Sequence, residues 1–510
     1  MQLVYDAPPL SWTFFYDAVL DADALEAALS RALESYPVLA GRVVTMANDA
    51  HGRCRLAVAC DNQGALLTRL NLPSVELPRS RGVQSGELPA WGKGWAGPPS
   101  LAKLQNDRAA PLLEVMLVSY ARGCSLCIKS SHGITDGQSL ALFLACWSRT
   151  YADAQSPMPW PLLERTAQDE QGHLTGDGES GQYEAACSCV RAPRSEVASS
   201  PSGAIEDLLP AGTLARLAMR AVVDPSMGFH AGSQAVVGAC FHFTAAQLAH
   251  IKCAAAAYDA APPAEAAAEE GSSAVGHEQK DARDAQSATA PTTFDALVAL
   301  LWRSVTLARK RRGALDRAHL LPPRLFFPAN VRGRMAPPLP NHFVGNATMG
   351  ILVQLDSETC AHSACFALWP CAHARLCRMR TGGLCTVAAA VQRHKSAAVT
   401  AASIAQQLAY LDAETRRGRK KRWTVNPFDN GVLLSDWRFP DAPLYDAATF
   451  GKAAPFWFEP ALDVAMRFPY VGCLLQSPPG SPAPGIAVLI NLPADEVSAV
   501  MQSLADAAAC

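Results

Sequence analysis

The sequence predicts a mixed fold of helices and strands, of the α/β or α+β class, divided into two halves. Segments with helical periodicity occur along the chain together with short, apolar, β-prone segments. Two polar stretches interrupt them: residues 167–205 read as a long linker and residues 254–291 as a disordered insertion. The length of 510 residues favours two or more domains, or two similar lobes.

In the first half, local signals predict a helix, a hairpin and a second helix. Residues 23–36 carry apolar side chains at helical spacing, with an Asp at position 21 or 23 as the cap and Pro37 as the stop. Residues 112–120 and 124–131 are apolar and β-prone, and only Ala-Arg-Gly separates them, which predicts a hairpin. An amphipathic helix is expected to follow from about 137 to 151.

The second half shows the same mixture of patterns. A helix is expected over 293–310 and a strand over 325–330. Near the end of the chain, 485–492 reads as a strand and 494–507 as a helix. We place the division between the halves near residues 200–235.

Composition narrows the class of protein. The formal net charge is -2 and the pI is about 6.6, which argues against a general binder of nucleic acids or anionic membranes. The N-terminus has no basic region followed by an apolar one, and no run of 18 apolar residues occurs, so we expect neither a secretory signal nor a membrane span. Sixteen Cys without such a signal favour reduced thiols and a cytoplasmic protein.

The segment from Ser131 to Gly137 carries the main chemical signal. It reads Ser-His-Gly-Ile-Thr-Asp-Gly between the predicted strand and the predicted helix. That context can hold His132 at a strand end, where an imidazole can take up a proton at neutral pH and return it. Asp136 can either orient this imidazole or hold the loop through a salt bridge. A His and an Asp four residues apart are a weak signal alone, and the alternative is a hydrogen-bonded core or loop histidine.

Other site chemistries find little support in the sequence. It contains no Gly-x-Ser-x-Gly elbow, no Gly-x-x-x-x-Gly-Lys-Ser/Thr loop and no Gly-x-Gly-x-x-Gly. A Cys- and His-rich stretch within about 358–384 has no Cys-x-x-Cys pair, so we expect no metal site and interpret it as a disordered insertion.

One strongly basic cluster occurs, between Arg416 and Arg422. Such a run usually forms a solvated face. The alternative is a patch, including Lys421 and Arg422, that attracts the phosphates of a nucleotide-bearing thioester or an acidic acceptor.

Four segments, in order, carry longer motifs. They are Tyr-Pro-x-x-Ala-Gly-Arg at 36–42, His-x-x-x-Asp-Gly at 132–137, Thr-Phe-Asp-x-Leu-x-Ala-x-x-Trp-Arg at 293–303, and Asn-x-Arg-x-Arg, Pro-Pro-x-Pro and Gly-Asn-Ala within 330–347. Together they resemble the BAHD-type acyl-CoA-dependent acyltransferases, which include hydroxycinnamoyl transferases of secondary metabolism.

A second signature of that family is matched only in part. The family has Asp-Phe-Gly-Trp-Gly after a Ser-Trp strand. This chain has Ser435, Asp436 and Trp437, and later Thr449-Phe450-Gly451-Lys452-Ala453. Phe450 and Gly451 fit the signature and their neighbours do not. In the family this segment is mainly structural, so the departure bears on stability or CoA binding more than on the chemistry.

The resemblance implies a fold and a domain organisation. It implies two chloramphenicol-acetyltransferase-like lobes joined by a crossover loop, with a central channel that admits CoA from one face and acceptor from the other. We assign 1–190 to the N-terminal lobe, 191–235 to the crossover and 236–510 to the C-terminal lobe, with insertions at 254–291 and about 358–384. It further implies a monomer.

The resemblance also implies the chemistry. His132 would deprotonate a hydroxyl or amine, which attacks the thioester carbonyl directly, with acyl-CoA as co-substrate and no permanently bound cofactor. Ser435 or Trp437 would stabilise the oxyanion. Asp136 would be structural and paired with an Arg, for which Arg332 is the candidate, and Gly137, Phe450 and Gly451 would be structural motif residues.

Two alternatives stay open at this stage. A condensation-type or wax-ester-type acyltransferase usually has a second His where this chain has Ser131. A non-catalytic relative would bind acyl-CoA or a metabolite without turnover.

The resemblance also suggests residues that contact the acceptor. In hydroxycinnamoyl transferases, an Arg before the Ser-Trp strand can bind the carboxylate of an acidic acceptor. Lys421 or Arg422 lies at about that spacing in this chain.

Overall fold

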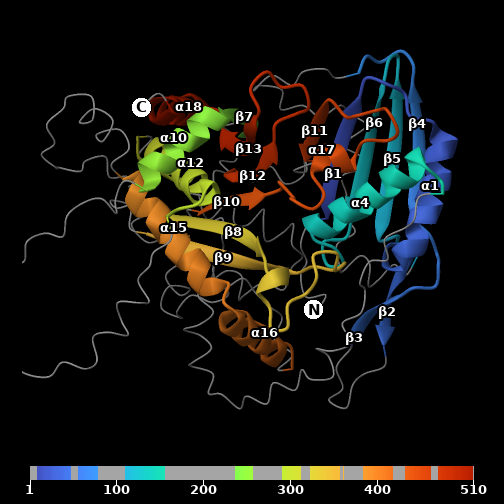
Figure 1. The fold of residues 1–510 in the computed structure, drawn as a ribbon, viewed down its shortest axis with the longest axis horizontal. Coiled ribbons are helices and arrows are strands. Elements are labelled where there is room, and N and C mark those ends of the chain that lie inside the picture. Colours follow the sequence, from blue (N-terminus) through green and yellow to red (C-terminus); the bar gives the residue numbers. More distant parts are fainter. Residues whose placement is uncertain are drawn as a thin grey trace, which may run out of the picture.

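A computed structural model describes segments of both halves of the chain. The described residues are 9–46, 55–77, 109–155, 236–256, 290–311, 322–355, 360, 383–416, 431–460 and 469–508. They form two large sheets with helices packed against them, which confirms the mixed fold class (Figure 1).

The first lobe consists of a five-stranded sheet and two helices. The strand order is β11-β1-β6-β5-β4, antiparallel except for the β4–β5 pair. The strands are β1 (Leu10–Tyr16), β4 (Leu66–Leu72), β5 (Leu113–Tyr120), β6 (Cys124–Ser130) and β11 (Trp457–Pro460). The helices are α1 (Ala22–Ser35) and α4 (Gly137–Ala152), and a two-stranded sheet pairs β2 (Arg42–Met46) with β3 (Arg55–Ala59).

Local capping fixes where both helices of the first lobe begin. The Asp21 carboxylate accepts hydrogen bonds from the backbone N–H groups of Asp23 and Ala24, at 2.9 and 3.0 Å. Asp21 is therefore the cap of α1, which ends at Ser35, before the 3₁₀ turn Pro37–Ala40. Asp136 caps α4 in the same way, by accepting from the backbone N–H of Ser139 at 2.9 Å. The predictions of both helices and of the β5–β6 hairpin are confirmed.

The second lobe consists of a six-stranded sheet in the order β7-β13-β12-β10-β8-β9. Its strands are β7 (Val236–Thr244), β8 (Arg324–Asn330), β9 (Thr348–Gln354), β10 (Gly431–Asp436), β12 (Val471–Gln476) and β13 (Gly485–Pro493). Its helices are α10 (Ala245–Ala256), α12 (Thr293–Arg311), α15 (Leu384–Ala398), α16 (Ala401–Arg416) and α18 (Val497–Ala508). The short α17 (Leu444–Ala447) packs instead into the core of the first lobe. The helices predicted over 293–310 and 494–507 are thus present as α12 and α18.

Side-chain alternation along β12 and β13 places the second sheet between two cores. Leu474 and Val488 pack into the core formed with the second lobe's helices. Cys473, Leu475 and Ala487 face the other way and join the core of the first lobe. This part of the second sheet is therefore buried on both faces, and the two lobes share a continuous apolar contact.

The described structure corrects the predicted boundaries in three places. We assigned all of 236–510 to the C-terminal lobe, but β11 at 457–460 pairs with β1 at the edge of the first sheet. Its Phe458 packs against Phe14, with ring centroids 4.9 Å apart. Residues 254–256, placed in an insertion, instead end α10. Cys360, placed in the second insertion, is fully buried and its thiol lies 3.4 Å from the Thr306 hydroxyl.

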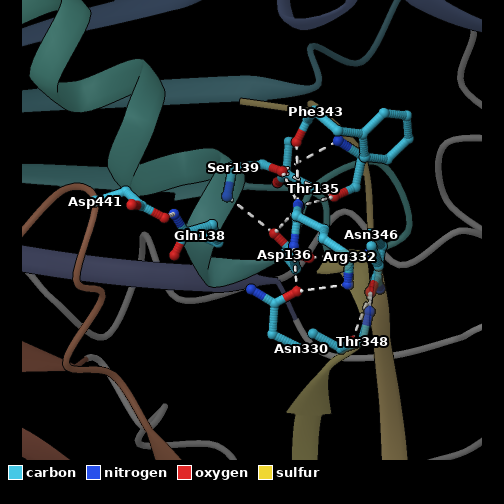
Figure 2. Close-up of polar contacts among 12 residues, drawn as sticks. Thr135, Asp136, Gln138, Ser139, Asn330, Arg332, Phe343, Asn346, Thr348 and Asp441 are labelled. Atoms are coloured by element: carbon cyan, nitrogen blue, oxygen red, sulfur yellow. Dashed lines mark hydrogen bonds and ion pairs between the residues drawn. The ribbon is translucent and has the colours of Figure 1, made fainter. Parts of the chain in front are cut away.

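A buried ion pair joins the two lobes (Figure 2). Asp136 lies just before α4 of the first lobe, and Arg332 follows β8 of the second lobe. The guanidinium of Arg332 donates to both carboxylate oxygens of Asp136, at 2.7 and 2.9 Å, and each side chain is 1% exposed. This bidentate geometry is the strongest form of such a pair.

The remaining polar atoms of this pair also have partners. Arg332 donates to the Ser139 hydroxyl and to the carbonyl oxygens of Phe343 and Gly345. The Asp136 carboxylate also accepts from the backbone N–H of Ala347 at 2.9 Å. Burial of two charges is costly unless every donor and acceptor is satisfied, and here the network provides these partners.

Because the pair is buried, we expect Asp136→Asn to destabilise the fold by about 3 kcal/mol, the lower end of the cost of breaking a buried pair. The measurement is the melting temperature of the variant, followed by its turnover. Asp23→Asn is the matched control, since the Asp23–Arg69 pair is exposed and its loss should leave the melting temperature nearly unchanged. An unchanged melting temperature with lost turnover would instead assign Asp136 a direct role in the chemistry.

Candidate active site

Three segments from different parts of the chain meet at the start of α4. The first is the loop from His132 to Asp136, which follows β6. The second is the stretch 330–348, which contributes Arg332. The third is 435–441, which includes the end of β10 and contacts α4 through a hydrogen bond from the Gln138 amide to Asp441 at 3.1 Å (Figure 2).

The second lobe presents the carboxyl ends of its parallel strands to this junction. Strands β8, β10 and β12 run parallel and end at Asn330, Asp436 and Gln476. Arg332 and Ser435 therefore lie at the edge of the sheet where ligands bind most often in sheets with parallel strands. The structure thus brings together sequence motifs that lie some 200 to 300 residues apart.

The hydrogen bonds of His132 determine which ring nitrogen is a base. Its Nδ1 lies 3.1 Å from the carbonyl oxygen of Thr135. A carbonyl oxygen only accepts, so the neutral ring carries its proton on Nδ1 and has its lone pair on Nε2. The residue is partly exposed. Burial of the ring lowers the pKa of His132 below 6.5, against smaller raising effects of its own backbone carbonyl, of the Asp136 carboxylate and of the Thr135 carbonyl. A neutral His132 at physiological pH can accept a proton at Nε2.

Asn346 is a residue of this site that the search for chemistry in the sequence did not single out. Its amide nitrogen donates to the backbone carbonyl of His132 at 2.9 Å, and it lies beside the loop in Figure 2. The signal in the sequence was its place in the Gly-Asn-Ala motif, which carries no chemistry by itself.

Gly137 is required where the third segment crosses α4. A Cβ atom at this position would lie 2.5 Å from the ring of Phe439, and the ring is buried. The absence of a side chain lets segment 435–441 pass directly over the start of the helix.

Ser435 and Trp437 lie together, and their hydrogen bond distinguishes them. The Trp437 indole N–H donates to the Ser435 hydroxyl oxygen at 2.8 Å. Ser435 pairs directly with Cys473 across the sheet, so its side chain lies on the face turned towards the first lobe. The Trp437 donor is already used, whereas the Ser435 hydroxyl retains its own proton for a further acceptor.

The altered second signature still forms its turn. Phe450 is buried against Trp147 and Tyr151, with ring centroids 5.1 and 5.4 Å away. Its backbone pairs with Ala453, and Gly451 has a φ of 61°, which favours glycine. Phe450 and Gly451 therefore have structural positions away from His132.

Several features considered in the sequence analysis do not form part of this site. Lys421 and Arg422 lie outside the described residues, as does most of the Cys-rich stretch. In the described ranges, no three His, Cys, Asp or Glu side chains are grouped so as to hold a metal ion. None of the described helices is long and apolar enough to cross a membrane.

Known proteins resemble this chain in sequence and in fold. BAHD acyltransferase BIA1 of Arabidopsis thaliana is 27% identical over 168 residues, which are 31% of this chain and 34% of that protein. The chain thus aligns with about a third of the length of that curated relative.

Among solved structures, TRI101 of F. sporotrichioides, complexed with coenzyme A and T-2, matches with a TM-score of 0.58 at 15% identity. The match covers 98% of this chain and 94% of that one. Vinorine synthase matches with a TM-score of 0.51 at 13% identity, over 98% and 91% of the two chains. At these identities the similarity shows a common fold.

The model of the Transferase family matches residues 10–175 and 264–506, which together are most of the sequence and include both lobes. The ion pair between Asp136 and Arg332, suggested by the family-like motifs, is present in the structure. On this match, the chain belongs to the Transferase family, that of the BAHD acyltransferases.

Proposed function

We propose that this protein transfers an acyl group from an acyl-CoA thioester directly to a hydroxyl or amine of a small metabolite, with His132 as the general base. The observation that carries the proposal is the contact of His132 Nδ1 with the Thr135 carbonyl at the junction of the two lobes, which leaves Nε2 as the basic nitrogen of the neutral ring. Membership of the BAHD acyltransferases and the coenzyme A in the TRI101 complex support CoA as the donor's carrier.

The reaction would take place in one addition and one elimination. His132 Nε2 accepts the acceptor's proton as the acceptor oxygen or nitrogen attacks the thioester carbonyl. The resulting oxyanion accepts a hydrogen bond from Ser435, whose hydroxyl proton is free because Trp437 donates to the oxygen. When the intermediate collapses, the C–S bond breaks and protonated His132 returns the proton to the CoA thiolate. Asp136 holds the loop and takes no part in proton transfer.

A non-catalytic binding protein is the second candidate, because the second family signature is altered at Thr449 and Lys452. Against it, Phe450 and Gly451 still form a turn, and the contact of His132 Nδ1 with Thr135 leaves Nε2 as the basic nitrogen. Release of free CoA decides between the two candidates.

The first test is the release of thiol from a panel of acyl-CoAs, including hydroxycinnamoyl-CoAs, with pooled alcohol and amine acceptors. We expect release only with an acceptor, and a loss of about 10² to 10⁴ in kcat for His132→Ala, the usual contribution of a general base. His394→Ala on the exposed side of α15 is the matched control and should keep full activity. Substantial turnover by His132→Ala would remove His132 from the role of base.

The pH dependence of kcat/KM tests the protonation state of the base. His132 acts as a base only when neutral, so activity should fall as pH decreases through its pKa. Burial lowers that pKa, and the acid limb should therefore lie below 6.5, with full activity retained at pH 7. A profile from initial rates between pH 4.5 and 8, inside the range where the wild type stays folded, measures it. An acid limb above pH 7 would contradict a neutral resting His132.

A third test separates Ser435 from Trp437 as the oxyanion donor. Ser435→Ala removes the free hydroxyl proton, and kcat should fall by about 10² to 10³, the usual cost of losing one such donor. Trp437→Phe removes only the bond to Ser435 and should cost less. Steady-state kcat values of the two folded variants give the comparison, and the reverse order would assign the donor to Trp437.

A further inference from the structure

Thr348 fixes the orientation of the Asn346 side-chain amide. The Asn346 Oδ1 accepts from the backbone N–H of Thr348 at 3.2 Å and from its hydroxyl at 2.6 Å (Figure 2). A backbone N–H needs an acceptor, and only the oxygen of the amide accepts. The amide NH₂ of Asn346 must therefore point the other way, towards His132.

The Asn346 NH₂ group meets His132 at two atoms. It donates to the His132 backbone carbonyl at 2.9 Å and lies 3.4 Å from the ring Nδ1. Because Nδ1 already carries the proton that Thr135 accepts, Asn346 cannot donate to it. The hydrogen bond to the His132 carbonyl holds the loop in place. The NH₂ group, a donor beside the Nδ1–H, disfavours a positive charge on the imidazole.

The other charged groups of the described site do not cancel this effect of Asn346 on the charge of the imidazole. Asp136 favours the charged ring, and its carboxylate is bound bidentately by Arg332. The only other side chain in hydrogen-bond range of the ring nitrogens, within the described residues, is the amide of Asn346. Its NH₂ is therefore the polar group placed to oppose protonation of His132.

From these contacts we infer that Asn346 is a positioning residue for the proposed base: locked by Thr348, it holds the His132 backbone and keeps the ring neutral, with Nε2 free. The inference rests on the proposed function of His132. Asn346 lies between Gly345 and Ala347, which bind Arg332 and Asp136. The second lobe therefore controls the protonation state of a base that the first lobe carries. It does so through the stretch 330–348, which also supplies Arg332 to the ion pair.

The decisive variants exchange the donor for an acceptor at constant shape. Asn346→Asp replaces the NH₂ beside the ring by a carboxylate oxygen, and Asn346→Ala removes both contacts. Thr348→Val removes the hydroxyl that locks the amide and leaves Asn346 itself intact. Asn71→Asp on the exposed surface of β4 is the matched control for the added charge.

The primary readout is the titration of the His132 ring, followed by ¹⁵N NMR of the histidine side chains and assigned by the signals lost in His132→Ala. We expect a wild-type ring protonated at Nδ1, and an upward pKa shift of about 1 unit or more in Asn346→Asp, because an opposite charge then stabilises the imidazolium. Thr348→Val should shift it in the same direction by less. An unchanged His132 titration in Asn346→Asp, equal to that of Asn71→Asp, would overturn the inference.

Turnover gives the second readout and keeps the two proposals distinguishable. For Asn346→Ala we expect kcat to fall about tenfold or more with KM within about twofold, because a displaced base lowers the rate and leaves binding intact. In Asn346→Asp the acid limb of kcat/KM should move to higher pH with the NMR titration. A His132 titration that shifts in Asn346→Asp, together with no turnover by the wild type, would refute only the proposed function. Lost turnover in His132→Ala, with titration unmoved by Asn346→Asp, would refute only the inference.

Discussion

The ion pair between Asp136 and Arg332 is the contact on which the geometry of the site depends. It is buried, bidentate and formed between the two lobes. The free-energy cost of burying both charges is offset only in the one geometry that keeps these hydrogen bonds. The same carboxylate caps α4 and accepts from Ala347. A single side chain therefore fixes the end of the His132 loop, the start of a helix and the position of the other lobe's loop.

This constraint explains why the base and its surroundings come from different lobes. β6 and α4 deliver His132 from the first lobe, and the carboxyl ends of β8 and β10 deliver Arg332 and Ser435 from the second. Neither lobe contains all three of these residues. One apolar face of β12 and β13 packs into the core of the first lobe. This contact stabilises the arrangement of the two lobes over a larger area than the ion pair does.

The parts of this structure that local signals determine were predicted from the sequence, and the parts that depend on partners far away in the chain were not. The helices α1, α4 and α12 and the β5–β6 hairpin have caps, turns and periodicity within a few residues. β11 is four residues long, and only its pairing with β1, more than 440 residues earlier, makes it a strand. The same holds in the site. The motif around His132 was visible, whereas the orientation of Asn346 depends on Thr348 and on the approach of the second lobe.

Low sequence identity with a shared fold follows from what each motif contributes physically. Arg42 donates to the carbonyl oxygens of Gly41, Gly64 and Ala109, so it ties three segments together through backbone groups that any sequence provides. The turn at 450–453 needs a buried ring and a residue that tolerates a positive φ, and Phe450 and Gly451 supply both. Thr449 and Lys452 replace family residues without removing either requirement. The fold therefore constrains a few backbone-directed contacts strictly and leaves most other positions free to diverge.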